Sequence, residues 1–449
     1  MCGLFFWTGP EGYSNAANII LSNLQLNARG PDSIGLVKTE RFVLAHFLLS
    51  VTGNFVHQPI VEDRIYTAFN GEIYNVNELN QKNEVSCFTA IEWNMPDITR
   101  SISSLSGEFA AILINENVNQ VLLVTDVFAT KPLWLGSKMS TNEWGASSYP
   151  SILSQMGANH IIQIPPNRVC LLNLEDGLTV SLGSHTYFSL EQHKDSFGDW
   201  HNAFERSIQR RASCNYPITI PLSSGYDSGG IAAAMLSLGL SATYYSFKAE
   251  ENLEVLDARH NLLGSFASYL QLTLPIADKI SDILKTKTPD FLYSRYLINA
   301  DYLMSEDPGA IGLSFICDVA SKLGSRVILS GQGADEILSD YYLNGKKLSN
   351  SSSRGGIFPN NLSDVYPWFN FYGGANRCYL LKEEYITGCY SMEGRYPFLD
   401  KELVQEFFYL TAFLKNSSYK APLASYLKAK NFPVELNSKK GFNVMCNLI

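Results

Sequence analysis

The sequence lacks paired cysteines, and this absence excludes two kinds of small stabilised domain. Its eight cysteines are scattered along 449 residues without a C-x-x-C pair. Zinc sites and disulfide scaffolds place their cysteines at close, regular spacings. We therefore expect neither kind of site, and a reducing compartment is the default setting for these thiols.

The chain also lacks long apolar runs and blocks of basic residues. No run approaches the roughly 20 apolar residues of a membrane span, and the N-terminus lacks the basic start and apolar core of a signal peptide. With 34 Lys+Arg against 43 Asp+Glu the formal charge is −9, and no cluster of cations is available for a phosphate backbone. We expect a cytoplasmic protein with no nucleic-acid and no membrane partner, whose ligands are small molecules.

The composition that is present is that of a large globular protein. Hydrophobic residues make up 46% and charged residues 17%, which excludes disorder for most of the chain. A single hydrophobic core usually stops growing at about 250 to 300 residues. The chain is long enough for two domains, and each can bury a core of its own.

Residues 1–190 carry short strand patterns separated by turn signals. Their β-branched and aromatic residues predict packed antiparallel sheets. Helical spacing over residues 14–27 and a shorter pattern over 88–93 predict covering helices. The expected strands are at residues 4–7, 41–50, 64–69, 109–115, 121–126 and 169–174.

The pattern changes after the polar stretch 189–198, where we place the domain boundary. Strands and helices then alternate, as in a parallel α/β sheet. A Ser/Gly/Asn-rich segment at 349–356 is expected to be a mobile loop. The expected elements are a helix through Arg210, a strand at 218–222, a helix at 230–238, a strand at 242–247, a helix at 311–323 and a strand at 326–329.

The segment Leu222-Ser223-Ser224-Gly225-Tyr226-Asp227-Ser228-Gly229-Gly230 follows a predicted strand and opens a predicted helix. Backbone N–H groups and hydroxyls at such a helix start suit a phosphate. The segment has neither the lysine of a Walker A loop nor the G-x-G-x-x-G spacing of a dinucleotide fold. A tight turn would also use glycine here, but three serines and three glycines around one aspartate exceed what a turn requires.

A second glycine loop, Ser330-Gly331-Gln332-Gly333-Ala334-Asp335-Glu336, again lies between a strand and a helix. Parallel α/β sheets bind ligands at the carboxyl ends of their strands. We therefore expect the two loops to meet at one site. Asp227 and Asp335 are then placed to share a Mg²⁺ with phosphate oxygens.

These two loops carry a resemblance to a known family. The first resembles the pyrophosphate loop of ATP pyrophosphatases, and the second is similar to the Ser-Gly-Glu-Gly-Ser-Asp-Glu loop of glutamine-dependent asparagine synthetases. Further motifs agree with that family in order, so that the resemblance runs from residue 2 to about 442. They are Met1-Cys2-Gly3, Ala28-Arg29-Gly30-Pro31-Asp32, Leu44-Ala45-His46, Phe69-Asn70-Gly71-Glu72-Ile73-Tyr74-Asn75, Glu393-Gly394-Arg395-Tyr396-Pro397-Phe398-Leu399-Asp400 and Lys439-Lys440-Gly441-Phe442.

The resemblance implies two domains of different fold. Residues 1–190 are expected to form a class II glutamine amidotransferase domain, an Ntn-type αββα sandwich of antiparallel sheets with helices. Residues 199–449 are expected to form a PP-loop ATP pyrophosphatase domain with a parallel α/β sheet. The implied substrates are glutamine, ATP with Mg²⁺, and a carboxylate, and a homodimer is left open.

The N-terminal thiol is the first implied catalytic group. In this family the initiator Met is removed and the new terminal Cys2 attacks the glutamine amide. An α-amino group titrates near pH 8, at about 7.7 to 8.0, so it can accept the thiol proton without a histidine. The resemblance places the Asn70 side chain and the Gly71 N–H in the oxyanion hole. Without these motifs, Cys2 would be interpreted as a small buried apolar residue.

Two positions depart from the family's glutaminase pattern. Leu48 stands where an arginine pairs with the α-carboxylate of glutamine, and Cys87 stands where an aspartate holds its α-ammonium group. Each lost contact is worth roughly 1.5 to 3 kcal/mol when it is sheltered from water. Glutamine affinity should fall unless Arg29, Arg41 or Arg64 supplies a cation.

The second implied reaction is the adenylation of a carboxylate, followed by attack of ammonia. Gln332 replaces the acidic residue of the family's second loop, and a neutral amide can orient a substrate but cannot take its proton. The acceptor carboxylate is therefore open. The resemblance assigns pyrophosphate to Ser223, Gly225, Asp227, Ser228 and Lys439, with Lys420 as a second candidate lysine; adenosine to Leu222, Ala249, Ser330 and Gly331; and Mg²⁺ to Asp227 and Asp335.

Three functions compete. The first is an ATP-dependent amide synthetase built like asparagine synthetase. The second is an amide-forming cyclase or ligase of the β-lactam or lasso-peptide cyclase type, in which the glutaminase domain is altered or inactive. The third is a regulator without catalysis, against which Asp227, Asp335 and Lys439 speak, because a scaffold has no need to keep a metal pair and a pyrophosphate lysine.

Overall fold

The computed structural model describes residues 2–9, 13–89, 91–249, 251–288, 292–295, 300–339 and 358–436. The chain divides into two compact units, Met1–Tyr187 with Gly388–Met392 and Phe188–Thr387 with Glu393–Ile449. The loop expected at 349–356 and Lys439 lie outside the described residues. Within the ranges given above, the search for a helix long and apolar enough to cross a membrane found none.

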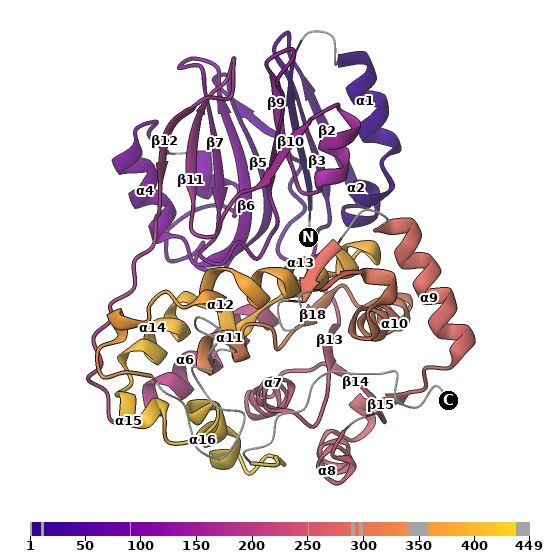
Figure 1. Ribbon diagram of the computed structural model, residues 1–449, viewed down its shortest axis with the longest axis vertical. Helices are drawn as coiled ribbons and strands as arrows, with labels where there is room; N and C mark the ends of the chain where they lie inside the picture. Colours follow the sequence, from indigo (N-terminus) through magenta and orange to yellow (C-terminus); the bar gives the residue numbers. More distant parts are fainter. Residues whose placement is uncertain are drawn as a thin grey trace. The chain divides into compact units, whose positions relative to one another are not determined.

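The first unit is the expected αββα sandwich. It holds two six-stranded antiparallel sheets, ordered β10-β8-β9-β1-β3-β2 and β12-β11-β7-β6-β5-β4. Figure 1 shows α4 beside the second sheet and α1 and α2 beside the first. The bounds are β1 (Gly3–Thr8), β2 (Ser33–Lys38), β3 (Phe42–Leu48), β4 (Ile60–Glu62), β5 (Ile65–Ile73), β6 (Gly107–Asn115), β7 (Gln120–Thr125), β8 (Trp134–Lys138), β9 (Glu143–Ser147), β10 (His160–Gln163), β11 (Val169–Asn173), β12 (Thr179–Gly183), α1 (Tyr13–Ser22), α2 (Leu24–Arg29), α3 (Ser86–Thr89), α4 (Met95–Ser104) and α5 (Pro150–Gln155).

Strand β6 shows why the central strands of this unit are almost unbroken apolar runs. Ile112 and Ile114 face the core between the two sheets. Ala111 and Leu113 face a second core, which includes Ile102 of α4. Since successive side chains of a strand point to opposite faces, a strand buried on both faces needs apolar residues at every position.

The helices differ from expectation at two places. Residues 14–27 form two helices, because the Asn23 side chain accepts the N–H of Leu26 at 2.9 Å and so caps a new helix. The pattern at 88–93 corresponds to the short α3, and α4 was not predicted. Its start signals, Asn94 as the cap and Pro96 in the first turn, were present in the sequence.

The second unit contains a parallel five-stranded sheet, ordered β15-β14-β13-β18-β19. A separate hairpin is formed by β16 and β17. The bounds are β13 (Ile218–Pro221), β14 (Thr243–Phe247), β15 (Ala267–Leu270), β16 (Leu292–Arg295), β17 (Ala300–Leu303), β18 (Val327–Leu329), β19 (Glu393–Arg395), α6 (Gly198–Ala212), α7 (Tyr226–Ser237), α8 (Leu253–Leu263), α9 (Leu274–Lys287), α10 (Pro308–Lys322), α11 (Ala334–Leu338), α12 (Phe369–Tyr372), α13 (Gly374–Cys389), α14 (Lys401–Tyr409), α15 (Ala412–Lys415) and α16 (Ala421–Ala429).

The order of these strands places the two glycine loops side by side. From β13 the chain first adds β14 and β15 on one side, and later adds β18 and β19 on the other. Parallel α/β sheets bind ligands at such a change of direction, outside the carboxyl ends of the strands. The first loop follows β13 and the second follows β18. A Cβ on Gly331 would lie 2.7 Å from Cβ of Asp227, so the loops are in contact.

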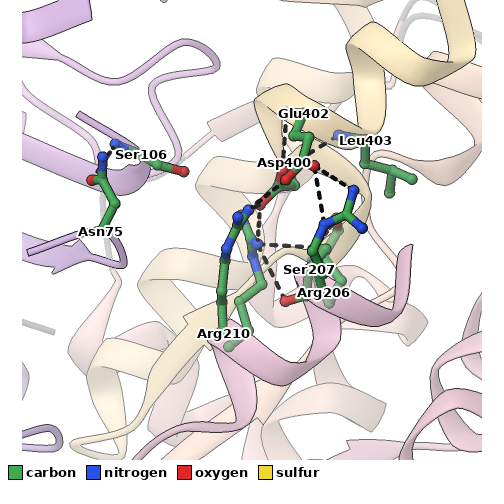
Figure 2. A network of polar contacts seen from close by, with 10 residues as sticks. Asn75, Ser106, Arg206, Ser207, Arg210, Asp400, Glu402 and Leu403 are labelled. Carbon is green, nitrogen blue, oxygen red and sulfur yellow. Dashed lines mark hydrogen bonds and ion pairs between the residues drawn. The ribbon is translucent and has the colours of Figure 1, made fainter. Parts of the chain in front are cut away.

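Helices α6 and α14 are joined by a network of charged side chains (Figure 2). Arg206 Nε and Arg210 Nη1 each donate to a Glu402 oxygen at 3.0 Å. Asp400 accepts backbone N–H groups of the first turn of α14 at 3.0 and 3.4 Å and pairs with Arg211 at 2.8 Å. Burial disfavours the charge of Asp400, but the arginines outweigh this and lower its pKa. The family motif that ends at this aspartate therefore has a structural task.

Candidate functional site

Cys2 precedes β1 and is 6% exposed. Its backbone nitrogen donates to Oδ1 of Asn70 at 2.6 Å, and its carbonyl oxygen accepts from Nε of Arg29 at 2.8 Å. The thiol lies 3.9 Å from the carbonyl oxygen of Leu49. The backbone that carries the sulfur is thus held from β5 on one side and from α2 on the other.

Asn70 presents a buried donor on the same side chain. Because its Oδ1 binds Cys2, its Nδ2 points elsewhere, and it has no hydrogen-bond partner in the described part of the chain. An unsatisfied buried donor costs about 1 to 3 kcal/mol, and oxyanion holes are places where such donors are kept. The next residue, Gly71, has φ of +126°, and a Cβ there would lie 1.9 Å from the carbonyl oxygen of Glu108. Only glycine fits this position.

His46 fixes the backbone next to Asn70. Its Nε2 lies 2.9 Å from the carbonyl oxygen of Phe69, so this nitrogen carries the proton. Burial lowers the pKa of His46 to about 4, and the ring is therefore neutral at pH 7. Its Nδ1 is a buried acceptor without a partner among the residues that the structure describes. The sequence placed His46 in a motif but assigned it no role.

The two altered positions of the glutamine clamp are enclosed and uncharged. Leu48 is 7% exposed and Cys87 is 9% exposed. Burial, with a smaller contribution from the charge of Glu84, raises the pKa of Cys87 to about 11, so the thiol is neutral at pH 7. Neither side chain offers a charge to the zwitterionic end of an amino acid.

The three arginines named above as alternative cations for the glutamine carboxylate each have a partner. Arg29 is fully buried and donates to the backbone carbonyl oxygen of Cys2. Arg41 pairs with Glu175, with 3.6 Å between nitrogen and oxygen. Arg64 pairs with Glu116, which directly follows β6, at 3.4 Å. Among these three arginines, Arg29 is the one that contacts Cys2.

The first glycine loop of the second unit is tied by its own hydroxyls. Ser223 Oγ and Ser228 Oγ lie 2.8 Å apart, and the N–H of Gly225 donates to Ser223 Oγ at 3.1 Å. The N–H of Ser224 donates to Oε2 of Glu251 at 2.6 Å. Helix α7 starts immediately after the loop, so its N-terminal dipole favours negative charge there.

Asp227 and Asp335 converge on one cation. The ammonium group of Lys420 contacts Oδ1 of Asp227 and lies 3.0 Å from Oδ1 of Asp335. Lys420 is 2% exposed. Burial disfavours its charge, but the two carboxylates outweigh burial and raise its pKa. The hydroxyl of Tyr419 donates to Oδ1 of Asp335 at 2.6 Å. The three charged groups come from α7, α11 and the start of α16.

These carboxylates suit a Mg²⁺ that is held jointly with phosphates. Mg²⁺ is commonly bound by one or two carboxylates together with water and phosphate oxygens. Across the described ranges no group of three or more His, Cys, Asp or Glu side chains is placed to hold a metal ion. Two carboxylates therefore suit a Mg²⁺ whose remaining ligands are phosphate oxygens and water, rather than an ion bound by protein groups alone.

The residues expected around adenosine lie at the ends of neighbouring strands. Ala249 follows β14, Leu222 follows β13, and Ser330 with Gly331 follows β18. Leu222 and Ser330 are buried, and Ala249 is partly exposed. The topology thus brings together four residues that the sequence separates.

Helix α13 lies beside the second loop and supplies a carboxylate. Gln332 Nε2 is 3.4 Å from Oδ1 of Asn376, and the backbone N–H of Gln332 donates to Ser330 Oγ at 3.1 Å. Glu383, two turns beyond Asn376 on the same helix face, is hydrogen-bonded to the Ser330 side chain. Burial raises the pKa of Glu383 to about 7. An acidic group therefore lies next to the loop whose own acid is Gln332.

Sequence reasoning missed several of these residues. Glu251, Glu383 and Arg259, the last of which is described below, lie among other charged residues, and such a run usually marks a solvated face; Tyr419 is uncharged and belongs to no motif. No local pattern distinguishes them. Lys420 was a second candidate lysine and lies at the site, whereas Lys439 is outside the described residues.

Comparison with known families assigns both halves of the chain. The family model described as a glutamine amidotransferase domain matches residues 1–169. The model described as asparagine synthase matches residues 199–373. Both loops of the second unit lie within the second match.

Individual proteins show the same similarity over most of the chain. Identity is 24% to asparagine synthetase (glutamine-hydrolyzing) 2 of Arabidopsis thaliana, over 90% of this chain and 70% of the plant protein. It is 23% to the asparagine synthetase (glutamine-hydrolyzing) of Sandersonia aurantiaca, over 90% of this chain and 77% of that protein. Among solved structures, the glutamine phosphoribosylpyrophosphate amidotransferase from B. subtilis, complexed with ADP and GMP, aligns with a TM-score of 0.35 and 12% identity over 75% of this chain and 77% of that chain.

Proposed function

Because the chain belongs to the glutamine-dependent asparagine synthetase family as a divergent member, we propose that it makes an amide from a carboxylate, glutamine and ATP. Hydrolysis of glutamine at Cys2 gives glutamate and ammonia. The carboxylate attacks the α-phosphorus of ATP, releasing pyrophosphate and forming an acyl-adenylate. Ammonia then displaces AMP, and the amide is the product. The expected compartment is the cytoplasm.

The convergence of Asp227, Asp335 and Lys420 at the meeting point of two glycine loops carries this proposal. A triphosphate needs cations and directed N–H donors around it, and both are found here. Ser223, Gly225 and Ser228 would bind the pyrophosphate with Asp227, and Lys420 and Lys439 would neutralise it as it leaves. Mg²⁺, when bound by Asp227 and Asp335, would share the charge of the phosphates.

The adenosine of ATP is assigned to the strand ends. Leu222 and Ala249 would line the base and ribose from β13 and β14, and Ser330 and Gly331 would line them from β18. Selectivity for the carboxylate is not set by these four residues.

For the glutaminase half, we propose that Cys2 is the nucleophile once Met1 has been removed. Asn70 Nδ2 and the N–H of Gly71 would stabilise the oxyanion that forms on the amide oxygen when the thiol attacks the amide carbon. The support is the buried Nδ2 of Asn70, which has no hydrogen-bond partner among the described residues. The other atom of this amide, Oδ1, binds the backbone nitrogen of Cys2. Arg29 would hold the backbone of Cys2 in place.

A second candidate function is supported by the enclosed, uncharged Leu48 and Cys87. In an amide-forming cyclase or ligase of the same family, the attacking amine belongs to the substrate, and glutamine need not be bound. The two functions differ in whether ammonia is required. Product formation from ATP and the acceptor alone would favour the cyclase.

Pyrophosphate–ATP exchange tests the adenylation half alone. We expect exchange that depends on one class within a panel of carboxylates, ranging from aspartate to peptides and uronic acids, with AMP as the nucleotide product. Adding glutamine or ammonium then shows which nitrogen source yields an amide. Release of ADP and phosphate in place of AMP and pyrophosphate would contradict the assignment of the first loop.

A further inference from the structure

Arg259 on α8 is a fully buried arginine whose guanidinium binds backbone oxygens. Its Nη1 donates to the carbonyl oxygens of Ser223 at 2.5 Å and Gly225 at 2.8 Å. Its Nε donates to the carbonyl oxygen of Pro433 at 2.9 Å. One side chain therefore joins the first glycine loop to the segment that follows α16.

The contact with Ser223 fixes the direction of an N–H group on the loop. A trans peptide is planar, so the carbonyl of Ser223 and the N–H of Ser224 point in opposite directions. With the carbonyl on Arg259, this N–H is turned to the other side, where it donates to Oε2 of Glu251 at 2.6 Å. The hydroxyl of Ser224 donates to the same oxygen. The side of the loop away from Arg259 thus already binds an anionic oxygen.

The contact with Gly225 acts in the same way one peptide later. Its carbonyl accepts from Arg259 and also from the N–H of Gly229 within α7, so the N–H of Tyr226 is turned to the opposite side, at the first residue of α7. Successive N–H groups that point to one side form an anion-binding concavity. Had these carbonyls rotated toward the ligand, their partial negative charge would have repelled phosphate oxygens.

Gly229 provides independent support for this arrangement. It lies inside α7, where glycine costs roughly 0.8 to 1 kcal/mol relative to alanine. A Cβ at Gly229 would lie 2.4 Å from Nη2 and 2.6 Å from Cζ of Arg259. The glycine therefore makes room for the guanidinium, which explains a part of the Gly229-Gly230 motif that phosphate binding does not require.

We propose that Arg259 is a positioning residue for ATP: it binds the carbonyl oxygens of Ser223 and Gly225, so that the N–H groups after them face the phosphates. This rests on the proposed function, because it assumes that the loop binds ATP. Arg259 acts through the loop and does not contact the nucleotide. Lysine would keep the charge but lacks the planar fork that binds two carbonyls and the Pro433 oxygen at once.

Three variants test this role in the full chain. Arg259→Met should weaken ATP binding at least about tenfold, because two charge-assisted contacts to the loop are lost. Arg259→Lys should weaken it less, and Gly229→Ala should act in the same direction by displacing the guanidinium. The measurements are the dissociation constant of ATP by calorimetry and the KM for ATP in pyrophosphate exchange. We expect KM to change more than kcat.

Arg211→Lys is the matched control, because Arg211 is also fully buried in the same unit, and its guanidinium pairs with Asp400 and the Ser207 side chain. It should lower the melting temperature without changing ATP affinity. Wild-type ATP affinity in folded Arg259→Lys and Gly229→Ala, or an equal loss in Arg211→Lys, would overturn the positioning role. If wild type binds ATP but shows no exchange while the variants bind it more weakly, the reaction is wrong and the role of Arg259 stands. If wild type does not bind ATP, both are wrong.

Discussion

Leu48 and Cys87 lie where the proposed glutaminase site would need charges to bind the zwitterionic end of glutamine. Both are enclosed next to the elements that carry Cys2 and Asn70, and neither carries charge. In the proposed glutaminase, the amide chemistry would depend on backbone groups and Asn70, whereas binding of the amino acid would depend on charges. Uncharged residues at positions 48 and 87 would then weaken glutamine binding and leave the catalytic geometry intact.

Leu48→Arg combined with Cys87→Asp should restore the clamp and lower the KM for glutamine. A carboxylate–guanidinium pair and a charge-assisted ammonium contact are each worth about 1.5 to 3 kcal/mol in a sheltered site, so a tenfold effect or more, that is at least about 1.4 kcal/mol, is expected. Glutaminase kinetics of the double variant and both single variants are the measurement. An unchanged KM, with wild type already saturated at low glutamine, would show that other groups bind the amino acid.

Glu383 predicts a pH dependence in the second unit. Burial raises its pKa to about 7, so between its usual range near 4.5 and about pH 7 the folded chain holds a proton that the unfolded chain releases. The free energy of unfolding should therefore fall as pH rises through this window. Amide formation should rise over the same window if ionised Glu383 takes the proton that Gln332 cannot take. Glu383→Gln should remove both dependences, as measured by melting temperature and by amide formation against pH.

Glu384→Gln is the control for that variant. Glu384 is the neighbouring buried carboxylate and accepts the hydroxyl of Tyr396 at 3.0 Å. Its charge contributes to the raised pKa of Glu383, so Glu384→Gln should move the pH profile of amide formation to lower pH and keep the pH dependence. The same profile in wild type and Glu383→Gln would remove Glu383 from the proton transfer.

At the scale of elements, the start of α16 delivers Lys420 to the two aspartates. Lys420 is the N-cap of this helix and has φ of 48°, a left-handed conformation that is uncommon for a residue with a side chain. The ammonium group is enclosed between Asp227 and Asp335. Strain of this kind persists where surrounding contacts require it, and here the two carboxylates provide those contacts.

Lys420→Met should destabilise the second unit by about 3 kcal/mol and abolish pyrophosphate exchange. Removing one partner of a buried ion pair leaves charge without compensation, and here two like charges would face each other. Lys428→Met is the control, since Lys428 lies exposed near the end of the same helix. Chemical denaturation and exchange assays measure both effects. Full exchange activity in Lys420→Met would show that Lys420 is not needed to neutralise pyrophosphate and that another lysine does so.

Local patterns predicted the elements well where periodicity and turn residues agree. The strands that include Phe109 and Val169 and the strand before Ser223 follow from apolar and β-branched runs, and both glycine loops follow from their composition. The break at Asn23 could not be read from helical periodicity, because apolar spacing continues across it and a single side-chain bond to a backbone N–H caps the start of a second helix. Cap chemistry decided that boundary.

At the scale of the whole molecule, the sites depend on contacts that no local pattern reveals. Cys2 and Asn70 meet through neighbouring sheets of the first unit, and Asp227 meets Asp335 because β13 and β18 are adjacent. The resemblance of the motifs to those of a known family predicted which of these residues belong to each site. Residues outside any motif, such as Glu383, could not be predicted. The raised pKa of Glu383 comes from its burial in the folded chain, which the sequence does not show.

The division into two units predicts that the two reactions fail separately. Cys2 and Asn70 lie in the first unit and Asp227 and Asp335 in the second, and each unit has its own sheets and core. Asp227→Asn should abolish ATP cleavage to AMP and pyrophosphate, since removing one charge from a site for Mg²⁺ and phosphates costs several kcal/mol, roughly 2 to 4. Glutamine hydrolysis should persist in this variant.

The reciprocal variant, Cys2→Ala, should lose glutamine hydrolysis and retain pyrophosphate exchange, and it should form the amide when ammonium replaces glutamine. A surface change in each unit, Arg100→Ala in the first and Lys285→Ala in the second, controls for indirect effects, because both side chains are more than half exposed and each pairs with a carboxylate on its own helix. Such exposed pairs contribute little stability, about 0.3 to 0.5 kcal/mol. If Asp227→Asn also abolished glutamine hydrolysis in a protein that stays folded, the glutaminase half would depend on the state of the ATP site, and the assumption of independent halves would be wrong.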